Sequence, residues 1–144
     1  MGLGSDPKIT KKTKAVIPVD FRGHPSDLPR IKKLCELSEL SVLEDASHSL
    51  GSRYIDRGKE YACGGCSHAD LATLSFHPVK HLTTGEGGAV LTNSEELYEK
   101  VKCLRSHGIK RDKEQLKSVG RVGDWVYDMC DLGYNYRLTD IQAA

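Results

Sequence analysis

One lysine, set among small and hydroxylated residues, is the strongest candidate for chemistry in this sequence. Lys80 follows the apolar run Leu71–Phe76, which contains Ser75, and it precedes the segment Thr83–Gly88 (TTGEGG). Hydroxyls and backbone amides at the end of a strand can bind a phosphate. A lysine among them could pair with that phosphate or, once desolvated, act as a nucleophile. Residue types alone leave a second reading open, a solvent-facing lysine beside a glycine turn.

A second candidate is Asp45, which follows the short apolar run Ser41–Leu43. A carboxylate at the end of a strand could pair with a cationic ring nitrogen of a bound cofactor, or it could only cap the next turn. The standard nucleotide motifs offer no competing assignment. Gly85, Gly87 and Gly88 do not form the dinucleotide fingerprint, and no GxxxxGK[ST] loop occurs. An ordinary NAD enzyme or phosphate-loop NTPase is therefore disfavoured.

The pair Cys63 and Cys66, followed by His68, suggests zinc at first sight. A structural zinc site needs four ligands, and no second CxxC pair follows. We therefore predict no metal site. His77 and His81 flank Lys80 and could line a substrate pocket, although a packing role is equally plausible.

Composition limits the class of protein. The chain has 144 residues, 38% hydrophobic and 28% charged, which is typical of a soluble globular protein. Its net charge of +1 argues against a nucleic-acid binder, and no apolar run approaches the length that spans a membrane. Five cysteines without a secretion signal indicate reduced thiols, so we expect a cytoplasmic protein.

The elements that must position Lys80 and Asp45 are expected to alternate between strands and helices. Strands are predicted at four apolar runs, Ala15–Val19, Ser41–Leu43, Leu71–Phe76 and Gly88–Leu91. The order strand, helix, strand is the βαβ pattern of a mostly parallel sheet.

Helices are predicted where a capping residue precedes apolar residues at helical spacing. One begins after Ser26 or Asp27, with Pro29 in its first turn, and another begins after Asn93 or Ser94. Residues 138–144 start a third helical pattern. The polar stretches 54–61 and 110–123 are expected to be a surface turn and a loop.

Four segments resemble successive blocks of the DegT family of sugar aminotransferases, in the family's order and at its spacing. They are LEDASHSLG (43–51), SFHPVK (75–80), TTGEGGAV (83–90) and GYNYR (133–137). The resemblance implies the α/β large domain of fold-type I pyridoxal-phosphate-dependent transferases, a mostly parallel sheet flanked by helices. Residues 1–144 would be part of that domain, without its amino-terminal segment and without the carboxyl-terminal small domain. We therefore expect these 144 residues by themselves to bind the cofactor weakly and not to turn over.

The resemblance also implies roles around the cofactor ring. Lys80 matches the lysine to which pyridoxal 5'-phosphate is attached, and Asp45 matches the carboxylate paired with the pyridine nitrogen. His48 occupies the position that contacts the phenolic oxygen of the ring. The chemistry agrees with these roles, because a protonated pyridine is a good electron sink and stays protonated only beside a buried anion. Lys80 must be neutral part of the time to move protons.

Further roles concern the cofactor phosphate and the assembly. Ser75 matches the hydroxyl that binds the phosphate. Asn135 and Arg137 match residues that reach the phosphate region of the neighbouring subunit's site, which implies a homodimer. The activity implied is transfer of an amino group from L-glutamate to a 4-keto sugar linked to UDP or another nucleotide.

Two other functions remain open on the sequence. One is a sugar dehydratase of the same family, although those that replace the lysine with histidine are excluded by Lys80. The other is a non-catalytic fragment that serves as a binding or assembly module, with zinc at Cys63 and Cys66. In relatives the segment around these cysteines is a surface loop.

Overall fold

The computed structural model describes residues 9–110 and 127–144. The chain forms two compact units, one up to Asn93 and one from Ser94 onward, and each is described by itself.

The first unit is built on a four-stranded sheet with the strand order β1-β2-β5-β6. The strands are β1 (Ala15–Val16), β2 (Ser41–Asp45), β5 (Leu71–Ser75) and β6 (Gly88–Leu91). β1 and β5 both run parallel to β2, and β6 runs antiparallel to β5. The predicted mostly parallel sheet is therefore confirmed, and so are the four predicted strand positions.

Three strand boundaries differ from the prediction, the smallest change being at β5, which ends at Ser75 instead of Phe76. β1 ends at Val16 instead of Val19, since Pro18 lacks the amide that a ladder requires. Val19 then forms an isolated bridge to Asp45. β2 continues through Asp45 instead of ending at Leu43, and the Asp45 amide donates to the Pro18 carbonyl at 2.8 Å.

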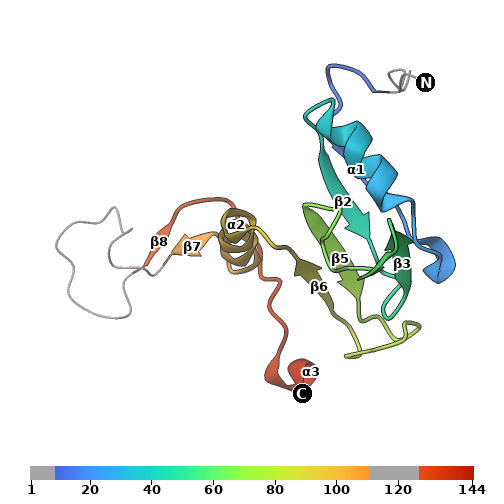
Figure 1. The fold of residues 1–144 in the computed structure, drawn as a ribbon. Coiled ribbons are helices and arrows are strands. Elements are labelled where there is room, and N and C mark those ends of the chain that lie inside the picture. The colour runs from blue at the N-terminus through green and yellow to red at the C-terminus, as the bar shows by residue number, and fades with distance from the viewer. Residues whose placement is uncertain (1–8, 111–126) are drawn as a thin grey trace. The chain divides into compact units, whose positions relative to one another are not determined.

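The helix α1 (Leu28–Glu36) packs along β2 and covers one face of the sheet (Figure 1). Asp27 is its N-cap and accepts a hydrogen bond from the Arg30 amide at 3.3 Å, and Pro29 lies in the first turn as predicted. The core between helix and sheet consists of buried apolar side chains, namely Cys35, Leu40, Val42 and Ala69.

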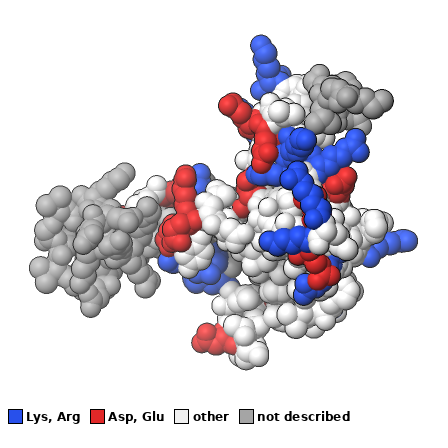
Figure 2. All heavy atoms as spheres, viewed as in Figure 1, with Lys and Arg blue, Asp and Glu red and all other residues white. Residues whose placement is uncertain are grey.

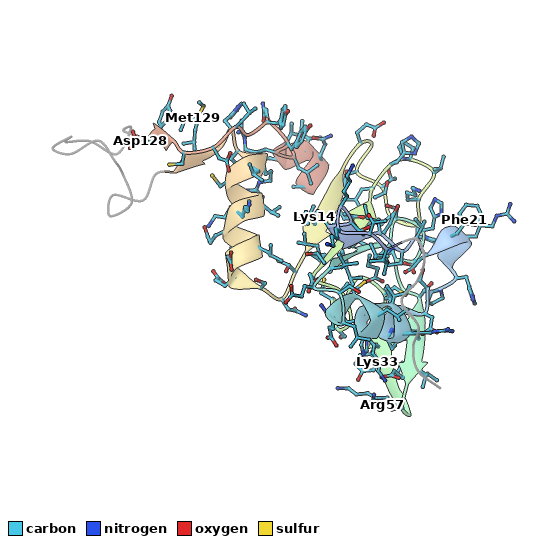
Figure 3. All side chains as sticks on the ribbon, turned by 90° about the horizontal axis from the view of Figure 1, so that it is seen from above. Lys14, Phe21, Lys33, Arg57, Asp128 and Met129 are labelled. Carbon is cyan, nitrogen blue, oxygen red and sulfur yellow. The ribbon has the colours of Figure 1, made fainter. Side chains whose placement is uncertain are left out.

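The polar stretch 54–61 contains the predicted surface turn at Arg57 and Gly58, but the prediction missed the two strands that flank it. It is the centre of an antiparallel hairpin of β3 (Arg53–Asp56) and β4 (Lys59–Ala62). Arg57 and Gly58 form its two-residue tip with φ of 49° and 79°. Positive φ at both positions matches the twist of the flanking strands. Figure 3 labels Arg57 at this tip.

The second unit is held together by one helix. α2 (Glu95–Arg105) begins at Ser94, whose hydroxyl accepts a hydrogen bond from the Leu97 amide at 3.4 Å. The remaining elements are short: β7 (Ile109–Lys110), β8 (Asp128–Met129) and α3 (Asp140–Ala143). α3 lies within the predicted third helical pattern. Of the loop predicted over 110–123, residue 110 lies in β7 and the rest lies outside the described residues.

Basic side chains gather over α1 (Figure 2), which carries Arg30, Lys32 and Lys33. Lys32 is not free, because its ammonium forms an ion pair with Asp70 at 2.7 Å. Within the described ranges, none of the helices has the length and hydropathy needed to cross a membrane.

Candidate functional site

Two of the predicted site residues, Asp45 and Ser75, end neighbouring strands, and His48 and Lys80 lie in the loops that follow these strands. Because β2 and β5 are parallel, Asp45 and Ser75, the last residues of the two strands, both lie at the carboxyl edge. Asp45 pairs with Thr73, so Ser75 lies two positions further along β5. Side chains alternate across a strand, which places Asp45, Thr73 and Ser75 on the same face.

A tight turn after β2 fixes the carboxylate of Asp45. Its Oδ1 accepts a hydrogen bond from the Ser47 amide at 3.1 Å, and its carbonyl accepts one from the Asp20 amide at 3.0 Å. The side chain is half-buried. The capping role left open by the sequence is thus present. It occupies one carboxylate oxygen, and no hydrogen bond to the other is recorded within the described part of the chain.

His48 lies in the same turn and is held by the 3₁₀ turn η1 (Phe21–Gly23). Its Nδ1 accepts a hydrogen bond from the Arg22 amide at 3.4 Å, and its ring lies 6.0 Å from the Phe21 ring. Gly23 has a φ of 82°, and a Cβ there would lie 3.1 Å from the His48 carbonyl oxygen. A glycine is therefore needed for this approach. Phe21 is labelled in Figure 3.

The loop after β5 folds back on itself and carries Lys80. The Lys80 amide donates to the His77 carbonyl at 2.9 Å, and the Phe76 amide donates to the Gly87 carbonyl at 2.8 Å. Ser75 Oγ accepts a long hydrogen bond of 3.4 Å from the His77 amide. His77 itself is exposed, as is His81, so neither has a packing role within the described residues.

The ammonium of Lys80 and the carboxylate of Asp45 do not form an ion pair with each other. Lys80 and Asp45 are both half-buried, and neither belongs to an ion pair among the described residues. An amine, a carboxylate and the Ser75 hydroxyl are therefore available at one sheet edge. This donor set fits pyridoxal phosphate, which offers an aldehyde, a protonatable ring nitrogen and a phosphate.

Asn135 and Arg137 belong to the second unit and are exposed. Asn135 forms an isolated β-bridge with Ser106, the residue just after α2. Tyr136 lies between Asn135 and Arg137, and its amide donates a hydrogen bond to the Arg105 carbonyl at 2.9 Å. Tyr134 and Tyr136 stack at 5.3 Å between ring centroids. Both predicted residues thus lie on one exposed strand-like segment. Their role at a neighbouring subunit's site stays a prediction.

The segment Cys63–Cys66 is a loop before β5, as expected, but it is not wholly a surface loop, because both cysteines are buried. Cys66 Sγ lies 3.2 Å from the Leu91 carbonyl. His68, the third candidate zinc ligand, turns elsewhere and shares a hydrogen bond of 2.8 Å with the Tyr54 hydroxyl. The CxxC pair and its histidine therefore do not form a common ligand set in the described structure.

Sequence reasoning missed a buried polar cluster beneath the site, made of Asp20, Glu44, Ser49 and Cys63. Burial and the nearby Asp20 carboxylate raise the pKa of Glu44 from 4.5 to about 7, against the hydrogen bond from the Gly64 amide. Burial and Asp20 also raise the pKa of the Cys63 thiol from 9.0 to about 12. The available signal was that Glu44 directly precedes Asp45 in a strand, which points it to the opposite, covered face.

Comparison with known proteins shows the family of the chain. Residues 6–144 match the model of the DegT/DnrJ/EryC1/StrS aminotransferase family. The chain is 45% identical over 136 residues to an uncharacterized protein of Methanocaldococcus jannaschii, covering 94% of this chain and 33% of that protein. It is also 45% identical over 130 residues to the UDP-4-amino-4,6-dideoxy-N-acetyl-beta-L-altrosamine transaminase of Campylobacter jejuni, covering 90% of this chain and 30% of that protein.

Solved structures give the same picture. The chain resembles the Helicobacter pylori aminotransferase PseC with a TM-score of 0.78 and 36% identity, over 94% of this chain and 32% of that one. It resembles the PLP form of a putative sugar aminotransferase of Streptococcus pneumoniae with a TM-score of 0.72 and 30% identity, over 94% and 35%. The predicted fold class is thereby confirmed. The chain spans about a third of the length of the curated relatives it matches. It belongs to the DegT/DnrJ/EryC1/StrS aminotransferase family.

Proposed function

We propose that the protein to which these residues belong is a pyridoxal-phosphate-dependent aminotransferase that moves an amino group from L-glutamate to a nucleotide-linked 4-keto sugar. The observation that carries the proposal is that Lys80 and Asp45, on loop and strand at one sheet edge, form no ion pair within the described part of the chain. This chain belongs to an aminotransferase family.

The residues would act on the cofactor as follows. Lys80 holds the cofactor and, once released, its Nζ takes and returns the proton that moves during amino transfer. Asp45 keeps the ring nitrogen protonated, His48 contacts the phenolic oxygen, and Ser75 binds the phosphate. When bound, pyridoxal phosphate supplies the electron sink for breaking the bond to the departing proton.

Asn135 and Arg137 complete the phosphate site of the neighbouring subunit, so the active form is a homodimer. Their exposed positions support this, because side chains that act on another subunit must be accessible on their own. The expected setting is the cytoplasm, where nucleotide-linked sugars are made.

The substrate class is supported by the names of relatives. The Campylobacter jejuni relative is named for a UDP-linked amino sugar, and PseC is described as acting in the biosynthesis of pseudoaminic acid. A related structure was determined with a TDP-sugar product. We therefore place the acceptor among nucleotide-linked 4-keto sugars of this kind.

The proposal is tested by incubating full-length protein and pyridoxal phosphate with L-glutamate and a UDP-linked 4-keto sugar. Formation of 2-oxoglutarate and of the 4-amino sugar is followed by mass spectrometry. Lys80→Ala is expected to abolish both products, while Lys33→Ala, an exposed lysine on α1, leaves them unchanged.

Other products would point elsewhere. Loss of water from the sugar without nitrogen transfer would assign the protein to the dehydratases of the family. Bound zinc with no product at all would favour the binding module.

A further inference from the structure

A pair of buried carboxyl groups lies directly behind the proposed cofactor site. Glu44 precedes Asp45 in β2 and points to the opposite face of the sheet. Asp20 is fully buried and Glu44 is 1% exposed. One carboxylate oxygen of each lies within 4.8 Å of the other and of Cys63 Sγ.

Hydrogen bonds tie this pair to both sides of Asp45. The backbone amide of Asp20 donates to the Asp45 carbonyl at 3.0 Å. Asp20 Oδ2 accepts from the Ser49 hydroxyl at 2.7 Å, and Ser49 lies at the far end of the turn that carries His48. Glu44 Oε1 accepts from the Gly64 amide at 2.9 Å. The pair is therefore bonded to Asp45 itself, to the turn that follows it and to the loop at Gly64.

Among residues 9–110 and 127–144, no cationic side chain compensates the two carboxyl groups. Neither Asp20 nor Glu44 forms an ion pair among the described residues. The titratable groups that face them are Cys63, Cys66 and Tyr54. Burial raises the pKa of each of these three, so all are neutral near pH 7. Two buried carboxylates this close cannot both be ionised at low cost.

The same three ligand atoms of Asp20, Glu44 and Cys63 could be taken for a cation site. The protein itself supplies donors to the carboxylate oxygens, because both Asp20 oxygens and Glu44 Oε1 accept hydrogen bonds. Among the described residues, no buried side-chain nitrogen or oxygen lacks a partner. A shared proton explains the cluster without an added ion.

We propose that Asp20 and Glu44 share one proton and act as positioning residues, holding the turn Asp45–Ser49 so that Asp45 and His48 face the cofactor ring. The positioning part rests on the function proposed above. The proton sharing and the rigidity of the turn are properties of the protein without cofactor.

The first test is the pH dependence of unfolding in urea for the cofactor-free full-length protein. Because the folded pKa of Glu44 lies above its ordinary value, the folded state holds a proton that the unfolded state releases between about pH 4.5 and 7. Wild-type stability should therefore fall relative to Glu44→Gln as the pH rises through this window. Glutamine keeps the shape of the protonated acid and does not titrate.

The second test addresses the turn. Ser49→Ala removes the hydrogen bond to Asp20 with little change in volume. Amide hydrogen exchange of the segment 44–50 is expected to become about tenfold faster, since one buried hydrogen bond is lost. The affinity for pyridoxal phosphate, titrated by fluorescence quenching, should fall several-fold. Glu60→Gln, at an exposed ion pair with Arg53, is the matched control for both tests.

The outcomes separate the two proposals. The positioning pair would be overturned if the difference in unfolding free energy between wild type and Glu44→Gln stayed constant across the pH window. It would also be overturned if the amides of the segment 44–50 exchanged in Ser49→Ala at the same rate as in wild type. Wild-type protein that binds no pyridoxal phosphate would overturn the proposed function, while the unfolding and exchange data would still decide on the pair.

Discussion

Asp45 and Lys80 carry opposite charges at the same edge of the sheet, yet neither forms an ion pair among the described residues. At the scale of single residues this separation matters, because a direct pair would satisfy both groups and leave nothing for a ligand. Asp45 is instead fixed by the Ser47 amide, and Lys80 is set by the backbone of its own loop. Each group is oriented, and each keeps its charge available.

Replacing the Asp45 carboxylate by an amide tests the role of its charge. In Asp45→Asn the hydrogen bond from Ser47 can persist, but the ring nitrogen of the cofactor loses the anion that keeps it protonated. We expect the rate of amino transfer to fall about 100-fold, the effect of a pKa change of about two units.

Asp27→Asn is the matched control, since asparagine caps a helix as well as aspartate does. Single-turnover kinetics with glutamate measure both variants. An Asp45→Asn rate within threefold of wild type would contradict the assignment of Asp45.

At the scale of elements, the sequence predicts most of what positions the site. Apolar runs at β2, β5 and β6 and the caps at Asp27 and Ser94 are local signals, and the structure has elements at each. The hairpin β3–β4 was missed because its signal is weak. Its tip pairs an arginine with Gly58, and a positive φ at Arg57 is uncommon for such a residue.

The sequence also did not predict the buried polar cluster of Asp20, Glu44, Ser49 and Cys63, and here the reason is different. Glu44 and Asp20 are charged residue types that are rarely fully buried, and Asp20 is 24 positions before Glu44 in the chain. Only the parallel pairing of β1 with β2 brings them together, and that contact depends on tertiary structure.

Asp70 connects α1 to the sheet and gives an element-scale prediction. Its Oδ1 accepts from the Lys32 ammonium and its Oδ2 from the Val42 amide, both at 2.7 Å. Partial burial would raise the pKa of Asp70, but these two donors outweigh it and hold the pKa below 3.8. Asp70→Asn should therefore cost about 2 kcal/mol of unfolding free energy at pH 7.

The stability cost of Asp70→Asn should depend on pH in a definite direction. A depressed carboxyl pKa stabilises the fold above pH 3.8, and that contribution is lost as the pH falls through the lower folded value. The cost of Asp70→Asn should thus shrink below about pH 4 in urea titrations. A cost that is the same at pH 3 and pH 7 would contradict the charged hydrogen bonds.

At the scale of the whole molecule, the segment 133–137 presents a run of exposed side chains. The aromatic side chains at its centre, Tyr134 and Tyr136, are 57% and 71% exposed. Exposed stacked aromatic rings next to an exposed arginine are typical of residues that become buried at protein interfaces. This supports the proposed homodimer, in which Arg137 serves the other subunit.

Mixed dimers test the shared site. Lys80→Ala and Arg137→Ala proteins should each have little activity alone. Co-refolded together they should recover about a quarter of wild-type activity, since half of the dimers are mixed and each mixed dimer has one complete site. A mixture no more active than its two components would show that Arg137 serves its own chain.

The attachment of the cofactor to Lys80 is the central claim, and it can be measured directly. Full-length protein is incubated with pyridoxal phosphate, reduced with borohydride so that the link to the occupied amine becomes permanent, and digested for mass spectrometry. The label is expected on Lys80, in stoichiometric amount, and is expected to be absent in Lys80→Arg. Label distributed over exposed lysines such as Lys33 and Lys59, unchanged in Lys80→Arg, would contradict the account.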